Sequence, residues 1–423
     1  MRLDQRPGRP VSGQSDAHSD RAFFVFLLAI CFAYFIYTEI DYFSGLGEGV
    51  FDARGRPIGR DFVNYWTGGV AVLQGTASQL FSPNAYHRYQ EALFGRELAE
   101  HYWSYPPHML FLVWPLGALS YLWAFAVWVL VTLGLYLWAA SAGQRDWRVV
   151  LFALPLAPSS FINFTAGQNG FLTAALLIGG LRLLGPQPVL AGILFALLTV
   201  KPQLGLLLPF ALLAARQWIA IASATVTTVL LVGLSTLVFG WQAWVAYVDV
   251  IVPLQSNVLT TFKGVYLAMM PSTYMALRLL EVEPGIRYAV QGIFAAVAVA
   301  GVVWAFARSK DWELQFGVLA IGTFLASPYT FNYDMAAISF ALVLAGLRGL
   351  REGFLPGERF VLAATWIIPM FVFWLNRHYL PLSPLLLLCC FSYFVARIYL
   401  ARPVEGPRTP LTGGGGSLAP RPL

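Results

Sequence analysis

Polar residues that can do chemistry lie at the ends of long apolar segments throughout this chain. They carry carboxylate, phenol, amide, ammonium, guanidinium and imidazole groups, and they are Asp61, Tyr105, Gln168, Asn169, Lys201, Asn332, Asp334, Arg377 and His378. A carboxylate can deprotonate an attacking hydroxyl group, which typically contributes about 10²–10⁴-fold to a rate. Amides can bind sugar hydroxyls, whereas a lysine or an arginine can stabilise a phosphate leaving group.

Each candidate also has a purely structural explanation. Asp61 and Asp334 stand where apolar helical stretches begin, so either carboxylate can cap a helix. The Asn-Gly pair within 167–170 is a typical tight turn. Lys201 can extend its ammonium to the membrane surface without an anion, and Arg377 can be an interfacial anchor. The functional interpretation therefore depends on whether the fold brings these residues together.

Residues 102–108 read Tyr-Trp-Ser-Tyr-Pro-Pro-His. The double proline forces an extended entry into a short helix, and the aromatic residues are typical of a membrane headgroup belt. His108 can bind phosphate when protonated or carry a proton. The sequence contains no metal-ligand spacing, phosphate-binding loop, dinucleotide fingerprint or nucleophile elbow.

The composition excludes an ordinary soluble enzyme. Hydrophobic residues make up 58% of the 423 residues and charged residues 11%, against about 25% charged residues in soluble domains. The net charge of +6 is scattered over short loops, so it indicates no nucleic-acid partner. The three cysteines lie in apolar segments and imply neither a disulfide framework nor a zinc site.

The apolar pattern predicts an all-α polytopic membrane protein with both termini on one side. Segments 1–21 and 401–423 are expected to be disordered and cytoplasmic, and 22–400 to form one membrane domain. The predicted transmembrane segments are 22–40, 121–141, 149–164, 170–184, 188–200, 203–215, 218–239, 285–307, 313–327, 335–347, 360–376 and 379–400.

Basic residues set the orientation of these segments. Two proline-broken stretches, 106–119 and 266–280, are expected at the outer interface without crossing. Most of the 27 lysines and arginines then face the cytoplasm. If both stretches crossed, 142–265 would invert and its arginines in short inner turns would lie outside. The preferred topology gives a large first outer loop at 41–119 and places all the candidate residues on the outer side.

In these motifs the chain resembles the polyprenyl-phosphate-mannose-dependent mannosyltransferases of glycosyltransferase family 87. These are integral membrane enzymes of the GT-C type. The resemblance covers most of 22–400, and its motifs are short but occur in the same order. They are Asp61-Phe62 with Tyr65, Tyr105-Pro106-Pro107, Gly167-Gln168-x-Gly170, Lys201-Pro202, and Ser327-Pro328-Tyr329 with Tyr333-Asp334.

The resemblance implies a GT-C-like bundle of about 12 transmembrane helices, with interfacial helices in the large first outer loop. It implies a polyprenyl-phosphate sugar donor, usually mannosyl, and an inverting transfer to a glycolipid or glycan. An acidic residue of the first outer loop is the expected catalytic acid or base, which here is Asp61. The expected location is the cell membrane, with the active site on its periplasmic face.

The predicted site assigns a role to each candidate. Asp61 is the general base, and Lys201 and Arg377 bind the donor phosphate. The sugar and the acceptor are expected to contact Tyr65, Tyr105, His108, Gln168, Asn169, Asn332, Asp334 and His378. One carboxylate can suffice, because a phosphate leaving group needs no protonation. No cofactor is expected, and a divalent metal is compatible with the reaction but not required.

Two other functions compete with this prediction. A transporter or flippase of lipid-linked sugars would also need polar groups in a membrane cavity, but it predicts them at mid-span, and the sequence shows no inverted repeat. A non-catalytic envelope assembly protein would not need the polar and aromatic residues of 41–119. No residue of the sequence specifies the acceptor, the sugar, the linkage or the oligomeric state.

Overall fold

The computed structural model describes residues 15–44 and 49–401, and its regular elements in these ranges are helices. Seven of the described helices are long and apolar enough to cross a membrane. They are α1 (Ser15–Ser44), α5 (Tyr121–Ser141), α11 (Trp218–Phe239), α15 (Pro284–Arg308), α17 (Ala336–Glu352) with the 3₁₀ turn η8 (Asn332–Met335) before it, α18 (Glu358–Arg377) and α19 (Ser383–Leu400). The predicted all-α membrane class is confirmed.

The remaining predicted spans are helical but bent or short. α6 (Trp147–Ala153) and α7 (Pro158–Ala166) meet at 55°, where Pro155 and Pro158 interrupt backbone hydrogen bonding. The short ones are α8 (Gly170–Leu183), α9 (Pro188–Leu197) with η4 (Leu198–Val200), η5 (Pro202–Gly205) with α10 (Leu208–Ala214), and α16 (Trp312–Ala326). Every predicted span is thus helical, and a bundle of about twelve crossing helices stays a prediction.

The first outer loop forms a cluster of short helices. They are α2 (Phe62–Leu73), η1 (Ala77–Phe81), α3 (Pro83–Phe94), η2 (Pro107–Met109), α4 (Leu110–Val113) and η3 (Trp114–Ala118). α2 and η3 are in backbone contact, because a Cβ atom on Gly69 would lie 2.6 Å from the backbone nitrogen of Gly117. Such a contact requires glycine, and it fixes the helix that begins just after Asp61.

A second group of helices follows α11. It comprises α12 (Trp241–Ala246), the π-helix η6 (Tyr247–Ile251), α13 (Val252–Thr260), η7 (Val265–Met269) and α14 (Thr273–Leu279). The stretch 266–280 was predicted as an interfacial helix, and it forms the short helices η7 and α14. The continuous helix 241–260 was not predicted, because its polar residues hide the apolar pattern.

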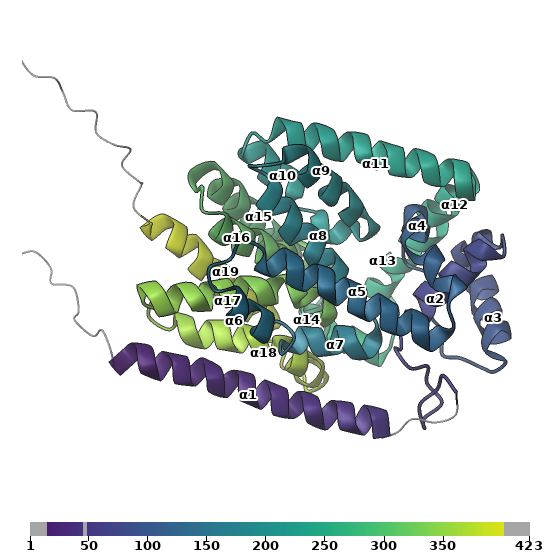
Figure 1. Ribbon diagram of the computed structural model, residues 1–423, viewed down its shortest axis with the longest axis horizontal. Helices are drawn as coiled ribbons and strands as arrows, with labels where there is room; N and C mark the ends of the chain where they lie inside the picture. Colours follow the sequence, from purple (N-terminus) through teal and green to yellow (C-terminus); the bar gives the residue numbers. More distant parts are fainter. Residues whose placement is uncertain (1–14, 45–48, 402–423) are drawn as a thin grey trace, which may run out of the picture.

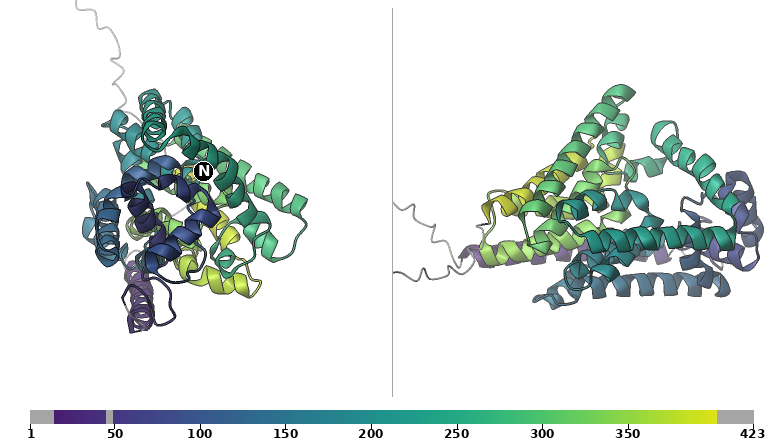
Figure 2. Two further views of the ribbon diagram at one scale, coloured as in Figure 1. Left: turned by 90° about the vertical axis from the view of Figure 1, so that its right-hand side faces the viewer. Right: turned by 90° about the horizontal axis from the view of Figure 1, so that it is seen from above.

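Both ends of the described chain lie at one end of the molecule. The start of α1 and the end of α19 are on the left in Figure 1, whereas α2, α3 and α4 lie on the right. Viewed from that right-hand end, α2 and α3 lie in front of the bundle (Figure 2, left). This arrangement agrees with termini on one side and the first loop on the other.

The predicted disordered tails are mostly outside the described residues, namely 1–14 and 402–423. Residues 15–21, which were also expected to be disordered, form the first turns of α1.

The helices differ widely in burial. The most apolar window of the span formed by η8 and α17 is 83% buried, against 6% for α1 and for α11. The latter two helices expose leucine, valine and aromatic side chains and are therefore the natural lipid-facing walls. The start of the central span, which carries Asn332 and Asp334, lies close to the chemistry described next.

Candidate active site

A polar cavity lies where the first-loop helices meet the ends of the bundle. It has about 1380 Å³ of unfilled space, counted to its open mouth. We call it the polar cavity; it is lined by Asp61, Asn64, Glu100, His101, Tyr102, Ser104, Tyr105, Gln168, residues 200–203, Tyr247, Gln255, Val258, Phe262, Lys263, Tyr266, Met269, Tyr329, Phe331 and Tyr333. Several predicted site residues, from four separate segments of the sequence, thus reach one space.

A rigid turn presents Asp61 to this cavity. In that turn the buried carboxylate of Asp52 accepts hydrogen bonds from the backbone N–H of Arg56 (2.8 Å) and from the guanidinium of Arg60 (2.9 Å). Burial raises the pKa of Asp52, but the hydrogen bonds from both arginines outweigh it and lower the pKa to about 2. Asp52 therefore stays ionised and holds the turn whose next residue is Asp61.

Asp61 does not use its carboxylate to cap a helix. It precedes α2, yet no capping hydrogen bond from its side chain is found within the described chain. The side chain is 43% exposed, and its Oδ2 atom accepts a hydrogen bond of 2.6 Å from Nε2 of Gln168. One amide therefore orients the carboxylate through Oδ2. Its other oxygen, Oδ1, lies on the side of His101, which also lines the cavity.

Gln168 links Asp61 to two tyrosines. The phenol of Tyr65 donates to Oε1 of Gln168 (3.3 Å) and lies 2.7 Å from the hydroxyl of Tyr105. Burial raises the pKa of both phenols, so both keep their protons. Since Tyr65 donates to Gln168, Tyr105 must donate to Tyr65. This series of hydrogen bonds fixes which end of the Gln168 amide faces Asp61.

The turn that carries Gln168 is itself held against the central span. A Cβ atom on Gly170 would lie 2.2 Å from the carbonyl oxygen of Tyr333. Asn163 accepts a hydrogen bond from the Gly170 N–H (2.8 Å) and donates one to the same Tyr333 oxygen (2.7 Å). Gly170 therefore serves a close approach as well as a turn.

His101 is a neighbour of Asp61 that the sequence did not reveal. Its Nε2 atom lies 4.0 Å from Oδ1 of Asp61, and its Nδ1–H donates to the carbonyl of Ala99 at 2.7 Å. In the neutral ring Nε2 is then a hydrogen-bond acceptor. Two acceptors 4.0 Å apart can bind hydroxyl groups of one substrate.

Lys201 and Asp334 form a buried ion pair at the inner wall of the cavity. Nζ lies 2.5 Å from Oδ1 of Asp334 and 3.2 Å from Oδ1 of Asn169, and it also lies over the ring of Tyr333. Asp334 additionally accepts a hydrogen bond from the backbone N–H of Phe331. Of the three N–H donors of the ammonium, two are thus used by Asp334 and Asn169.

Other predicted residues lie elsewhere. Arg377 and His378 are exposed and are not among the described residues that line the polar cavity. His108 is buried against Trp244 and Thr199, also outside the described lining. Burial lowers the pKa of His108 to about 4, so it is uncharged at neutral pH. Asn332 lines a neighbouring cavity instead.

The structure adds a cation that the sequence did not single out. Lys263 follows α13, is exposed and lines the polar cavity. The end of α13 is held by Arg278, whose guanidinium donates to the carbonyls of Val258 (2.9 Å) and Leu259 (2.6 Å). Nothing in the local sequence around Lys263 distinguishes it from an ordinary loop lysine, because its position depends on contacts with a distant segment.

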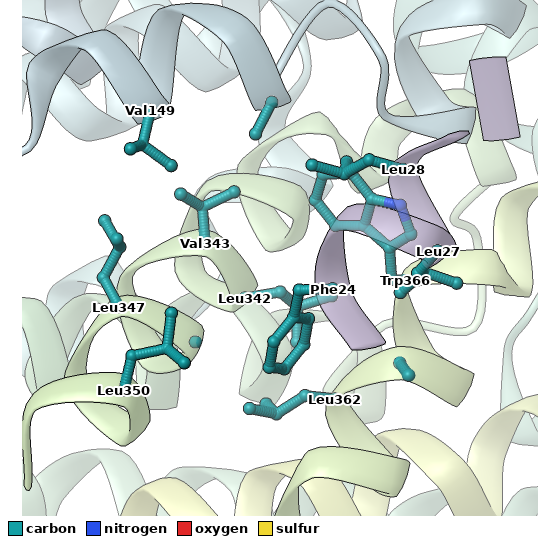
Figure 3. A pocket seen from close by; sticks show the side chains of 13 residues that line it. Phe24, Leu27, Leu28, Val149, Leu342, Val343, Leu347, Leu350, Leu362 and Trp366 are labelled. Carbon is teal, nitrogen blue, oxygen red and sulfur yellow. The ribbon is translucent and has the colours of Figure 1, made fainter. Parts of the chain in front are cut away.

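A different, apolar cavity lies between α1, α6, α17 and α18 (Figure 3). Side chains such as Phe24, Val149, Leu347 and Trp366 point into its space of about 540 Å³. No titratable side chain is found among its described lining residues. It therefore offers no acid, base or cation for catalysis.

Comparison with known proteins supplies the family. The model of glycosyltransferase family 87 matches residues 103–328, which is more than half of the chain. The chain belongs to glycosyltransferase family 87. This membership, with the seven apolar helices, makes the protein a membrane glycosyltransferase that has donor and acceptor substrates. No curated protein and no solved structure matched the chain.

The family 87 match covers only part of the polar cavity. It includes Tyr105, Gln168, Lys201 and Lys263 but ends before Asp334 and begins after Asp61. In the structure, the carboxylate of Asp61, which lies outside the match, is within hydrogen-bond distance of Gln168, which lies inside it. In the described residues of this family 87 chain no cluster of three or more metal-ligating side chains occurs; the expectation that no cofactor is required stays a prediction.

Proposed function

We propose that this family 87 glycosyltransferase moves a sugar, in the first instance mannose, from a polyprenyl phosphate to a hydroxyl group of a glycolipid or glycan. The reaction would take place on the outer, periplasmic face of the cell membrane, with Asp61 as general base. The observation that carries the proposal is the Asp61 carboxylate, exposed in a cavity shared with Lys201 and held by Gln168. The cavity thus contains both a base, Asp61, and a cation that can bind phosphate, Lys201.

In the proposed reaction the acceptor hydroxyl gives its proton to Oδ1 of Asp61. The hydroxyl oxygen forms a bond to the anomeric carbon as the bond from that carbon to the phosphate oxygen breaks. The electron pair leaves with the polyprenyl phosphate, and the anomeric configuration inverts. One carboxylate suffices because phosphate is a good leaving group, whereas a glycoside hydrolase needs a pair.

The donor phosphate is assigned to Lys201, with Lys263 in place of Arg377 as the second cation. Lys201 keeps one N–H for the phosphate but shares its charge with Asp334. Lys263 is exposed at the same cavity, whereas Arg377 is outside its described lining. Gln168 and Tyr105, which line the cavity, would bind the hydroxyls of the sugar and acceptor, and His101 would accept a hydrogen bond from a neighbouring hydroxyl. Asn169 is buried outside the described lining and would instead orient Lys201 through its Oδ1 atom.

The competing hypothesis, a flippase of lipid-linked sugars, predicts polar groups along a path through the membrane. The polar groups that line the polar cavity instead gather at one end of the bundle, where α2 and α3 lie across it (Figure 2). This placement favours a transferase that acts at the membrane surface over a flippase.

The decisive experiment is transfer by purified protein from labelled polyprenyl-phosphate sugars to a membrane lipid extract. We expect Asp61→Asn to lower turnover about 10²–10⁴-fold, because the amide cannot accept the proton. Asp249→Asn is the matched control, since Asp249 is an exposed aspartate outside the described lining of the cavity. Wild-type turnover in Asp61→Asn would show that Asp61 is not the general base. Sugar-lipid movement across vesicles without transfer would favour the flippase.

A further inference from the structure

Asn64 lies beside the proposed base and lines the same cavity. It stands three residues after Asp61, in the first turn of α2, so the two side chains project from one face of the helix. Only 8% of the residue is exposed. Neither the sequence prediction nor the proposed reaction gives this amide a role, although it is one helical turn from the carboxylate that would take the proton.

Two buried side chains of α3 orient the amide of Asn64. Its Oδ1 atom accepts hydrogen bonds from the hydroxyl of Tyr86 (2.9 Å) and from Nε2 of Gln90 (3.3 Å), and both partners are wholly buried. Burial raises the pKa of Tyr86, so the phenol keeps its proton and donates it. Its other acceptor, the backbone oxygen of Asn64, is farther away at 3.4 Å. Oδ1 therefore faces α3, with both of its lone pairs used.

The other end of the amide, Nδ2, points away from these partners. It carries two N–H donors, and it donates to no acceptor within the described part of the chain. Nor is Nδ2 among the unpaired side-chain atoms that the described residues seal from solvent. Since Oδ1 is turned to α3, the accessible polar atom of Asn64 is Nδ2, and it opens on the polar cavity.

Asn64 complements its neighbours in the cavity. Oδ1 of Asp61 and Nε2 of His101 are hydrogen-bond acceptors, whereas Nδ2 of Asn64 is a donor. A sugar hydroxyl both donates and accepts, so a sugar that gives a proton to Asp61 can accept an N–H from Asn64 through a second hydroxyl oxygen. Side chains three residues apart on a helix are about 5–6 Å apart at their Cβ atoms, a separation that one sugar ring can bridge.

We propose that Nδ2 of Asn64 donates a hydrogen bond to the acceptor substrate, at a hydroxyl oxygen next to the hydroxyl that Asp61 deprotonates. The inference rests on the proposed function and adds a substrate-binding residue to it. The acceptor is chosen over the donor because Asn64 adjoins the base, whereas the donor phosphate is assigned to Lys201 and Lys263, in other segments of the lining. Asn64 would thus select an acceptor with two neighbouring hydroxyl groups.

The test measures transfer by the full-length protein in nanodiscs from labelled polyprenyl-phosphate mannose to the membrane lipid extract. Each substrate is varied while the other is saturating, at a pH on the alkaline plateau of the rate. Asn64→Asp replaces the N–H groups with an oxygen and keeps Oδ1 for Tyr86 and Gln90. We expect KM for the acceptor to rise about tenfold, while KM for the donor and the melting temperature keep their wild-type values.

A neutral variant separates the lost N–H groups from the added charge. Asn64→Ser removes the amide without adding a charge, but it also takes the acceptor from Tyr86 and Gln90, so its melting temperature should be lower. Both variants lose the N–H donors in the cavity, so both should raise KM for the acceptor. Asn84→Asp is the matched control, because it adds the same charge at an exposed position of α3 outside the described lining. It should leave both KM values unchanged.

Three results overturn the inference: no rise of the acceptor KM in either variant, a rise in only one of them, or an equal rise of the donor KM. A rise only in Asn64→Asp would be an effect of charge, and a rise only in Asn64→Ser would reflect the lost contact with α3. Should Asn64→Ser not fold, Asn64→Asp and its control decide. Any of these results, with transfer by the wild type, leaves the proposed function standing. Absence of transfer by the wild type contradicts the proposed function and this inference with it.

Discussion

At the scale of single residues, the arrangement around Asp61 separates the two oxygens of one carboxylate. Oδ2 is occupied by the amide of Gln168, and Oδ1 faces His101 across 4.0 Å. Because Tyr65 donates to the other end of the same amide, the amide cannot rotate without losing both bonds. Orientation of the base thus depends on residues distant from it in the sequence.

Gln168→Glu tests this dependence. A second carboxylate would face Asp61 in place of the N–H donor, so turnover should fall about 10²-fold through misplacement of the base. Like charges also raise the pKa of one carboxyl group of such a pair. The base must be ionised, so the acid limb of the rate profile should move to higher pH.

The control for this substitution is Gln187→Glu, which adds the same charge in an exposed turn outside the polar cavity. Rate measurements between pH 4 and pH 9 would compare the two variants with the wild type. An unchanged acid limb in Gln168→Glu would mean that the amide does not orient Asp61.

Lys201 shows what sequence alone could and could not predict about the site. Its position at a span end was predicted, and because a lysine near hydrocarbon is costly it was expected either to reach the membrane surface or to bind an anion, the donor phosphate. Its partner Asp334 was predicted to reach the same face, but not to pair with it. His101 and Lys263 were missed, because their approach to the cavity depends on long-range packing that local sequence does not specify.

At the scale of elements, close backbone contacts position the site. α2, which begins just after Asp61, touches η3 through Gly69 and Gly117, and a Cβ on Gly117 would lie 2.3 Å from the backbone of Gly69. The apolar runs predicted the helices well, because hydropathy is a local property. They did not predict which helices touch, nor the helix 241–260, of which Tyr247 and Gln255 line the polar cavity.

Gly69→Ala should therefore destabilise the protein, whereas Gly134→Ala should not. The added methyl group at 69 would overlap backbone atoms, and overpacking typically costs about 1–3 kcal/mol. At Gly134, in α5, a Cβ meets nothing within 4 Å, and alanine favours a helix more than glycine does. Thermal unfolding in detergent should show a lower apparent melting temperature for Gly69→Ala alone. Equal values would mean that α2 and η3 can separate without cost.

At the scale of the whole molecule, the bundle places the polar cavity at one end and the start of α1 and the end of α19 at the other (Figure 1). The polar cavity lies among first-loop helices, the 167–170 turn and the start of the central span. Peripheral helices α1 and α11 each border an apolar groove that adjoins it. The lipid-linked donor proposed above would thus approach from the bilayer while its sugar stayed at the surface.

The orientation of this bundle in the membrane yields the last prediction. On a background without Cys31, Cys389 and Cys390, we expect a membrane-impermeant maleimide added to intact cells to label Ala92→Cys and Thr261→Cys. Both positions are exposed and belong to the polar-cavity end of the molecule. The excess of lysine and arginine in the opposite turns predicts that those turns lie in the cytoplasm.

Ala142→Cys and Gly185→Cys are the matched controls, since both are exposed in turns of the opposite end. They should react only after the cells are opened. The reverse pattern would place the polar cavity in the cytoplasm, where Asp61 would meet a different pool of donors. Labelling of Ala92→Cys and Thr261→Cys from opposite sides would contradict the fold itself, because first-loop residues such as Asn64 and Glu100 line the same cavity as Phe262 and Lys263.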